Sequence, residues 1–227
     1  MATSTTPGYD DLLALLTLLT GDEKHDWSAL STLDVLWVLY DRVLRVDPRE
    51  LDDPERDRFL LSKGHGPAAY YAVLAAKGFV DADSLADFGG FESRLGYHPD
   101  RMLIPGVEIS SGSLGHGLPI AVGMTLALDA GRRGDARVVC LVGDAELDEG
   151  SNWEAVQLAG RLGLGRLTVV VVDNQSSTYH WPGGIAARFE LEGWSSADVD
   201  GRDHEALERA LTTTGDQPHV VVAEVGR

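Results

Sequence analysis

Hydrophobic positions in the N-terminal part of the chain recur at three- and four-residue spacing, which is the spacing of one helix face. We therefore expect helices over residues 10–20 and 28–44, within an N-terminal helical segment that spans 8–45. The stretch AAYYAVLAAKG predicts a further helix that ends at Gly78, a residue type that commonly terminates helices. Residues 89–113 are rich in Gly, Pro and Ser and show no period. Long connections of this kind in compact domains are often functional.

From Leu114 onward, helical patterns alternate with continuous apolar runs. We expect helices near 117–130, 151–162 and 203–213, alternating with strands at 137–142, 167–172 and 219–225. The runs RVVCLV, LTVVVV and HVVVAEV are apolar at consecutive positions, as strands covered on both faces must be. The pattern predicts an α/β fold, a doubly wound parallel sheet with helices on both faces. No repeat and no linker interrupts it, so we expect residues 1–227 to form a single domain.

Composition and charge exclude several functional classes. The net charge of −17 disfavours a nucleic-acid surface, because a polyanion would need basic patches that the sequence lacks. No apolar run reaches the roughly 18 to 20 residues that cross a bilayer, and the N-terminus lacks the basic and hydrophobic regions of a signal peptide. We therefore expect no membrane contact and a cytoplasmic location. The one cysteine, Cys140, falls within a predicted strand, where a thiol behaves as a small buried hydrophobe.

Candidate chemistry lies where two predicted strands end. Ligands of such sheets bind at the carboxyl ends of the strands. Asp144 and Asn174 follow two successive strands, 30 residues apart, which places both at the same edge. A carboxylate and a carboxamide oxygen are suitable ligands for Mg²⁺ or Ca²⁺. The small residues Gly143 and Ala145 leave backbone N–H groups open to a phosphate, and the helix near Ser151 starts beside them. The sequence thus predicts a diphosphate bridged by a metal.

A purely structural interpretation of the same residues is also open. Asp144 and Asp148 are residue types that cap a following helix, and Asn174 is a residue type that shapes turns. The occurrence of Asp144 and Asn174 together at this spacing favours the metal site.

Several motifs in the same order resemble the transketolase family. The stretch GDAELDEGSNWEAVQLAGRLGLGRLTVVVVDN is similar to the family's thiamine-diphosphate motif, which begins with GDG and ends about thirty residues later in an Asn. DRFLLSKGHGPAAYYAVLAAKGF and GYHPDRMLIPGVEISSGSLGHGLPIAVGMTLAL resemble two further family segments. The resemblance covers roughly residues 25 to 225 and implies the thiamine-diphosphate-binding fold.

The resemblance implies roles for particular cofactor and metal residues. In the family, the Asp of GDG, the later Asn and a backbone carbonyl two residues beyond hold the metal, and these positions match Asp144, Asn174 and Ser176. The family's GPLG turn contacts the cofactor through its backbone and matches Gly112, Ser113, Leu114 and Gly115, alongside Gly143 and Ala145 of the GDG turn.

Three histidines surround the reactive carbon and the sugar hydroxyls in the family. They match His25 in EKHDW, His65 in SKGHG and His98 in GYHPD. Imidazoles suit this role because they can donate to a developing alkoxide and transfer protons near neutral pH.

The chain departs from the family pattern at several places. Ala145 replaces the second glycine of GDG, which would cost about 1 kcal/mol if that position has a positive φ or lies against the phosphate. After Asn174 an apolar residue and a D-G turn give way to QSSTYHWPGG, which puts the usual sugar-phosphate specificity in doubt. Lys24 and Asp26 flank His25 where the family has Gly and Pro. His116 stands where Gln is common.

Length is the largest departure, because full transketolases continue with a second domain that supplies a catalytic Glu to the aminopyrimidine ring, and with a third domain. The chain therefore resembles the N-terminal subunit of a split transketolase. The expected partner is a C-terminal subunit, with two copies of each. The implied activity is transfer of a two-carbon ketol unit from a ketose to an aldehyde with thiamine diphosphate and Mg²⁺. Two alternatives stay open: the alpha-type subunit of a thiamine-dependent 2-oxoacid decarboxylase or ligase, and a non-catalytic scaffold subunit.

Overall fold

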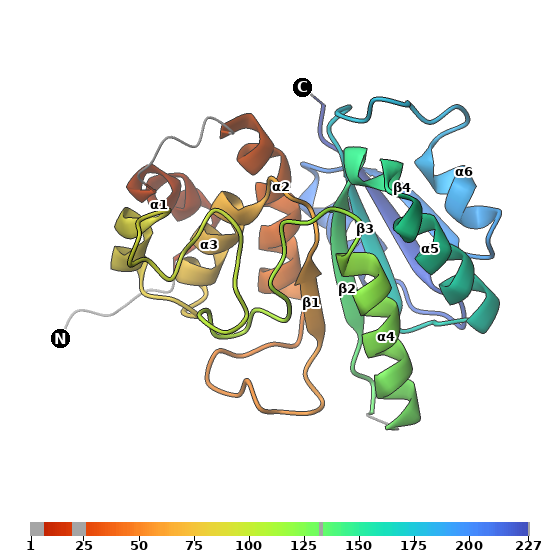
Figure 1. Ribbon diagram of the computed structural model, residues 1–227, viewed down its shortest axis with the longest axis horizontal. Coiled ribbons are helices and arrows are strands. Elements are labelled where there is room, and N and C mark those ends of the chain that lie inside the picture. The colour runs from red at the N-terminus through yellow and green to blue at the C-terminus, as the bar shows by residue number, and fades with distance from the viewer. Residues whose placement is uncertain (1–6, 20–25, 132–133, 227) are drawn as a thin grey trace.

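Five parallel strands form the centre of the molecule in the computed structural model, which describes residues 7–19, 26–131 and 134–226 (Figure 1). Their order across the sheet is β1-β2-β3-β5-β4, and every neighbouring pair is parallel. The strands are β1 (Arg58–Leu61), β2 (Val138–Gly143), β3 (Leu167–Asp173), β4 (Ser195–Asp200) and β5 (His219–Glu224).

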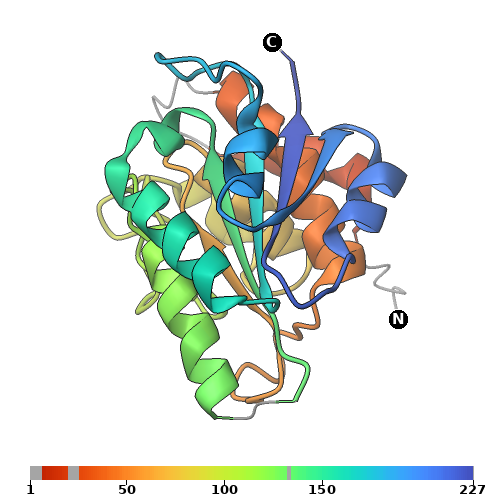
Figure 2. The same ribbon diagram turned by 90° about the vertical axis from the view of Figure 1, so that its right-hand side faces the viewer.

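Helices cover both faces of this sheet, as predicted. One face carries α4 (Gly117–Ala130), α5 (Gly150–Leu162) and α6 (Ile185–Glu190), and Figure 2 shows α4 and α5 side by side. The other carries α1 (Leu12–Leu18), α2 (Asp26–Val38), α3 (Pro67–Ala76) and α7 (His204–Leu211). Short helical turns complete the chain: η1 (Tyr9–Asp11), η2 (Leu39–Val43), η3 (Ala82–Asp87) and η4 (Ala145–Asp148).

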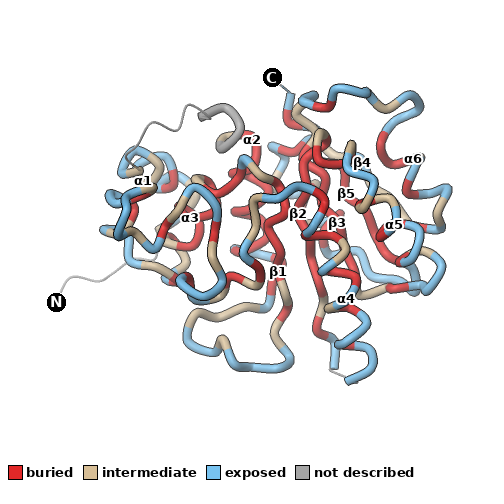
Figure 3. Tube along the Cα trace, viewed as in Figure 1, coloured by how far each residue is buried: buried red, intermediate tan, exposed pale blue. Residues whose placement is uncertain are grey.

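The continuous apolar runs explain this two-sided core. Successive side chains of a strand point to opposite faces. In β2, Val139 and Leu141 pack with the cluster under α2 and α3, whereas Val138, Cys140 and Val142 pack with the cluster under α4 and α5. The strands are consequently buried along most of their length between two helical layers (Figure 3). Burial raises the pKa of the Cys140 thiol well above its usual value, so this group is a core residue.

Most predicted elements are confirmed with shifts of a residue or two at their ends. The helix predicted over 117–130 is α4, and the strands predicted over 137–142 and 167–172 are β2 and β3. The helix predicted up to Gly78 is α3, and Gly78 has the positive φ of a helix terminator. Among the described α-helices and strands, three were not predicted, namely β1, α6 and β4, and neither were the short turns η3 and η4. None of the helices among the described residues is long and apolar enough to span a membrane.

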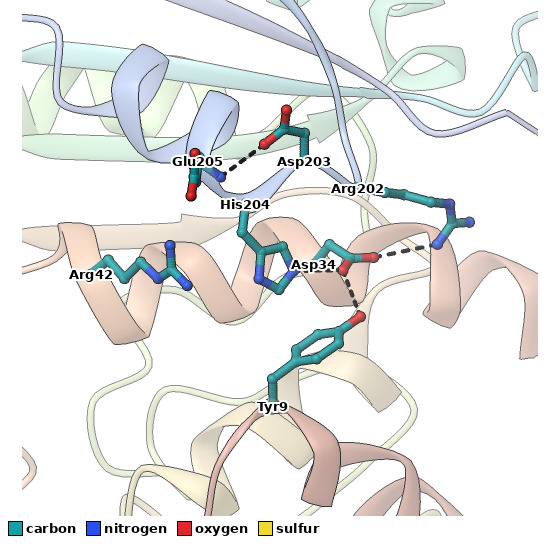
Figure 4. Close-up of a pocket in the computed structure, with 7 residues that line it drawn as sticks. All are labelled: Tyr9, Asp34, Arg42, Arg202, Asp203, His204 and Glu205. Carbon is teal, nitrogen blue, oxygen red and sulfur yellow. Dashed lines mark hydrogen bonds and ion pairs between the residues drawn. The ribbon is translucent and has the colours of Figure 1, made fainter.

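The N-terminal helices are tied to the C-terminal half by one buried carboxylate. Asp34 in α2 accepts hydrogen bonds from the hydroxyl of Tyr9 (2.6 Å) and from Nε2 of His204 (2.8 Å), and it pairs with Arg202 at 3.3 Å. Figure 4 shows these side chains converging from η1, α2 and the start of α7. Because both oxygens of Asp34 are engaged, this cluster links η1, α2 and the start of α7 within the helical layer on one face of the sheet.

Candidate cofactor site at the carboxyl edge of the sheet

Four segments meet at the carboxyl edge of β1, β2 and β3. Residues 62–66 follow β1, η4 follows β2, and the segment from Asn174 follows β3. The fourth segment is the turn 112–115, which leads into α4. The in-register pairing of Gly143 with Val172 brings the ends of β2 and β3 level with each other. The ends of β2 and β3, which precede Asp144 and Asn174, are therefore adjacent.

Asp144 is buried at the end of β2 with 1% of its surface exposed. Its Oδ1 accepts a hydrogen bond from the Ser176 hydroxyl at 2.6 Å, and its Oδ2 accepts one from the Ser177 backbone N–H at 2.8 Å. Asp148 binds the same segment, since the Ser177 hydroxyl donates to its Oδ1 at 3.0 Å. Neither carboxylate caps η4 or α5 through its side chain. The capping interpretation is therefore wrong for both residues.

Asn174 carries a signal that points to a cation. Its carboxamide oxygen is buried and accepts no hydrogen bond from the described residues. A buried oxygen without a donor is costly, and a bound metal ion is one way to satisfy it. No group of three or more His, Cys, Asp or Glu in the described part of the chain is arranged to hold a metal. The carboxylate of Asp144 and the orphan carboxamide oxygen of Asn174 are the kind of ligands that suit a hard cation such as Mg²⁺, which takes few protein ligands and completes its shell with phosphate and water.

The segment after Asn174 folds back onto Asp144 and is then anchored on α5 and α6. Trp181 packs against Trp153 with ring centroids 5.5 Å apart, and the Arg188 guanidinium stacks over these two rings at 4.8 Å and 4.4 Å respectively. Gln175 and His180 have positive φ angles of 58° and 52°, a strained conformation for side chains of this kind. The unusual QSSTYHW sequence thus forms a fixed segment whose two serines bind the predicted metal ligand.

Glu146 connects three of the four segments and was not selected in the sequence analysis. The Ser62 hydroxyl and the Gly115 backbone N–H both donate to its Oε1, and the Gly143 N–H donates to its Oε2. Burial raises the pKa of this carboxyl, although the three donors and Lys63 oppose the shift. Ser62 also accepts a hydrogen bond from the Gly117 N–H at 3.0 Å, which ties β1 to the start of α4.

His98 lies directly against the predicted cofactor turn. A Cβ atom on Gly112, which has a φ of 122°, would lie 2.7 Å from Cγ of the His98 ring. The neighbouring Gly64 faces Leu114 of the same turn, with its Cβ position 3.1 Å from a Leu114 methyl. The structure therefore brings His98, the residues before His65 and the turn 112–115 together.

Replacing Gly112 by alanine should lower the free energy of unfolding more than replacing Gly183. Both glycines have positive φ, so both alanines introduce backbone strain of about 1 kcal/mol or more. Only the alanine at position 112 must also displace an imidazole, which adds roughly 1 to 3 kcal/mol of overpacking. Urea denaturation of the two variants measures the difference. Equal losses would contradict the placement of His98.

The remaining predicted residues have the following positions. His65 and Ser113 are exposed at the edge of the site. Ala145 begins η4 and has no positive φ, so the backbone part of the cost expected for this alanine does not arise. His25 lies outside the described residues.

Lys63 and Glu146 are the main residues of the site that sequence reasoning missed. Lys63 follows β1, and the short strand RFLL was not recognised, so the polar residues at its end did not stand out. Burial lowers the pKa of Lys63 to about 8, against the opposing attraction of Asp144 and Glu146. The acidic residue two positions after Asp144 was the available signal for Glu146.

Ligands of doubly wound parallel sheets bind at the carboxyl ends of the strands, and this is the edge at which the buried Asp144 carboxylate and the Asn174 carboxamide lie. A family model described as "Transketolase, thiamine diphosphate binding domain" matches residues 11–223. The chain belongs to the transketolase family through this domain.

Three relatives show how the chain compares with known proteins. It is 54% identical over 220 residues to "Ferredoxin fas2" of Rhodococcoides fascians, covering 96% of this chain and 72% of that protein. It is 37% identical over 208 residues to one subunit of the apulose-4-phosphate transketolase of Actinobacillus succinogenes, covering 88% and 75%. The transketolase structure from Leishmania mexicana superposes with a TM-score of 0.78 at 27% identity, covering 96% of this chain and 37% of that one. The chain thus spans little more than a third of that transketolase.

Proposed function

We propose that this chain is the thiamine-diphosphate-binding subunit of a two-component transketolase. The reaction is transfer of a two-carbon ketol unit from a ketose to an aldehyde acceptor, in the cytoplasm, with residues 1–227 acting as one domain. The observation that carries the proposal is that buried Asp144 and the unpartnered carboxamide oxygen of Asn174 follow the adjacent strands β2 and β3 at one edge of the sheet. Two relatives are named as single subunits of transketolases, which supports a second, C-terminal subunit that would provide the catalytic Glu.

Each group of residues has a distinct task in this proposal. Thiamine diphosphate, when bound, would supply the carbanion chemistry that breaking and re-forming a carbon–carbon bond of a ketose requires. Asp144 and Asn174, with the Ser176 carbonyl, would hold Mg²⁺, and the backbone of 112–114 and 143–145 would orient the diphosphate. His65 and His98 are exposed beside the turn, where they would donate hydrogen bonds to substrate oxygens and transfer protons.

The similarity to a protein named a ferredoxin does not bring iron–sulfur chemistry to this chain. Iron–sulfur clusters are held mainly by several cysteine thiolates, usually four. The whole sequence contains a single cysteine, Cys140, and this residue is buried in the core.

Isothermal titration of thiamine diphosphate into the chain plus its partner subunit, with and without Mg²⁺, tests the proposal. We expect uptake of thiamine diphosphate that requires Mg²⁺. A complex that shows no such uptake would refute the proposed function.

Assays with ketose and 2-oxoacid donors, run in parallel on the same complex, distinguish the transferase from the 2-oxoacid alternative. The polar residues Ser176 and Thr178, in the segment where the family has an apolar residue, are the reason to include the second donor class.

A further inference from the structure

Lys63 is a buried cation in the candidate cofactor site, at the carboxyl edge of β1, β2 and β3, called here the cofactor edge. Only 6% of its surface is exposed, although lysine is among the residues that are seldom fully buried. Its aliphatic stem lies along Gly143, where a Cβ atom would be 3.3 to 3.5 Å from three carbons of the lysine. Gly143 begins the turn 143–145, called here the GDA turn. Its lack of a side chain makes room for Lys63, in addition to any role toward a phosphate.

The ammonium group of Lys63 holds the main chain of His65. Its Nζ donates a hydrogen bond to the His65 carbonyl oxygen at 2.9 Å, which closes the turn between the two residues. Gly64, at the centre of this turn, packs against Leu114 of the cofactor turn. The position of the His65 backbone is thus set from two sides, by the lysine and by the turn 112–115.

Two buried carboxylates explain why a lysine can occupy this place. Asp144 and Glu146 are 1% and 2% exposed, and both attract the Lys63 ammonium. A buried cation is tolerated when opposite charges lie nearby and its hydrogen bonds are satisfied. These two charges favour the charged form of the lysine, whose stem lies against Gly143 and whose ammonium donates to the His65 carbonyl.

We propose that Lys63 is a positioning residue that couples the GDA turn to His65 and so sets the location of the His65 imidazole over the cofactor edge. The role of His65 toward substrate rests on the proposed function, whereas the coupling itself is a property of this chain alone. A displacement of about 1 Å in a group that handles the reacting substrate can cost roughly 100-fold in rate.

The test compares Lys63→Met, which keeps the stem and removes the donor, with Lys63→Arg, which keeps a donor and a charge. Lys77→Met is the matched control, because Lys77 pairs with Asp41 and stacks on Trp37 away from this edge. Hydrogen exchange of the cofactor-free chain should become faster in residues 64–66 for Lys63→Met, and stay closer to wild type for Lys63→Arg. The control should leave these amides unchanged.

In the complex with the partner subunit, Lys63→Met should lower kcat roughly 10- to 100-fold with little change in KM for the ketose, and Lys63→Arg should recover part of the loss. Unchanged exchange in 64–66 for Lys63→Met would overturn the coupling. A fall in kcat that Lys63→Arg does not reduce would overturn the role assigned to the donor. If exchange in 64–66 is faster in Lys63→Met but the wild-type complex transfers no ketol unit, the coupling stands and only the proposed function is refuted.

Discussion

Asp144→Asn should remove Mg²⁺-dependent uptake of thiamine diphosphate and lower ketol transfer by at least about 100-fold. The substitution keeps the size of the side chain and one oxygen that can accept from the Ser176 hydroxyl, so the local fold is largely retained. It removes the charge that the proposed metal site depends on. Metal-ion stabilisation of this kind contributes several kcal/mol, and each 1.36 kcal/mol is a factor of about ten.

Asp148→Asn is the matched control for this substitution. Asp148 lies in the same turn and accepts from the Ser177 hydroxyl, but it is not a predicted metal ligand. We expect calorimetry on the assembled complex to show metal-dependent cofactor uptake for Asp148→Asn and none for Asp144→Asn. Full activity in Asp144→Asn would instead favour the scaffold interpretation, in which the chain keeps the fold without using the site.

The buried strands were predictable because burial on both faces leaves a continuous apolar run. β2, β3 and β5 are largely apolar at consecutive positions and rich in the β-branched residue valine, which favours strands covered on both faces over helices. β4, with the sequence SSADVD, lies at the sheet edge and is only partly buried, so its sequence is polar and carried no strand signal. β1 is four residues long, and a run of that length cannot be assigned from periodicity alone.

The candidate site also contains residues that could be predicted from local sequence and residues whose roles depend on contacts between distant segments. Asp144 and Asn174 could be selected because each directly follows a recognisable strand, and the strand order of a doubly wound sheet brings them to one edge. Glu146 bonds to Ser62, which is 84 positions earlier in the chain. That contact depends on β1 pairing with β2, so it could not be inferred before β1 was known. The metal, catalytic and cofactor assignments themselves stay predictions.

Glu146→Ala should lower the free energy of unfolding by about 3 kcal/mol or more. The alanine leaves the Ser62 hydroxyl and the backbone N–H groups of Gly115 and Gly143 without their acceptor, and each buried unsatisfied donor costs about 1 to 3 kcal/mol. Glu146→Gln keeps one acceptor oxygen and the volume, so its loss should be about 1 kcal/mol. Urea denaturation of the two variants beside the wild type measures both values.

The pH dependence of the same comparison separates the charge of Glu146 from its shape. Burial raises the pKa of the folded-state carboxyl above the value of 4.5 that it has when exposed. The folded protein therefore holds this proton more tightly than the unfolded chain, and the stability from Glu146 falls as pH rises from 4.5 through the folded-state pKa. Glu146→Gln has no such proton, so wild type should lose stability relative to this variant over that interval. A difference in the free energy of unfolding between wild type and Glu146→Gln that stays constant with pH would contradict this expectation. The carboxyl would then have the same pKa in the folded and unfolded states, because the three donors offset the effect of burial.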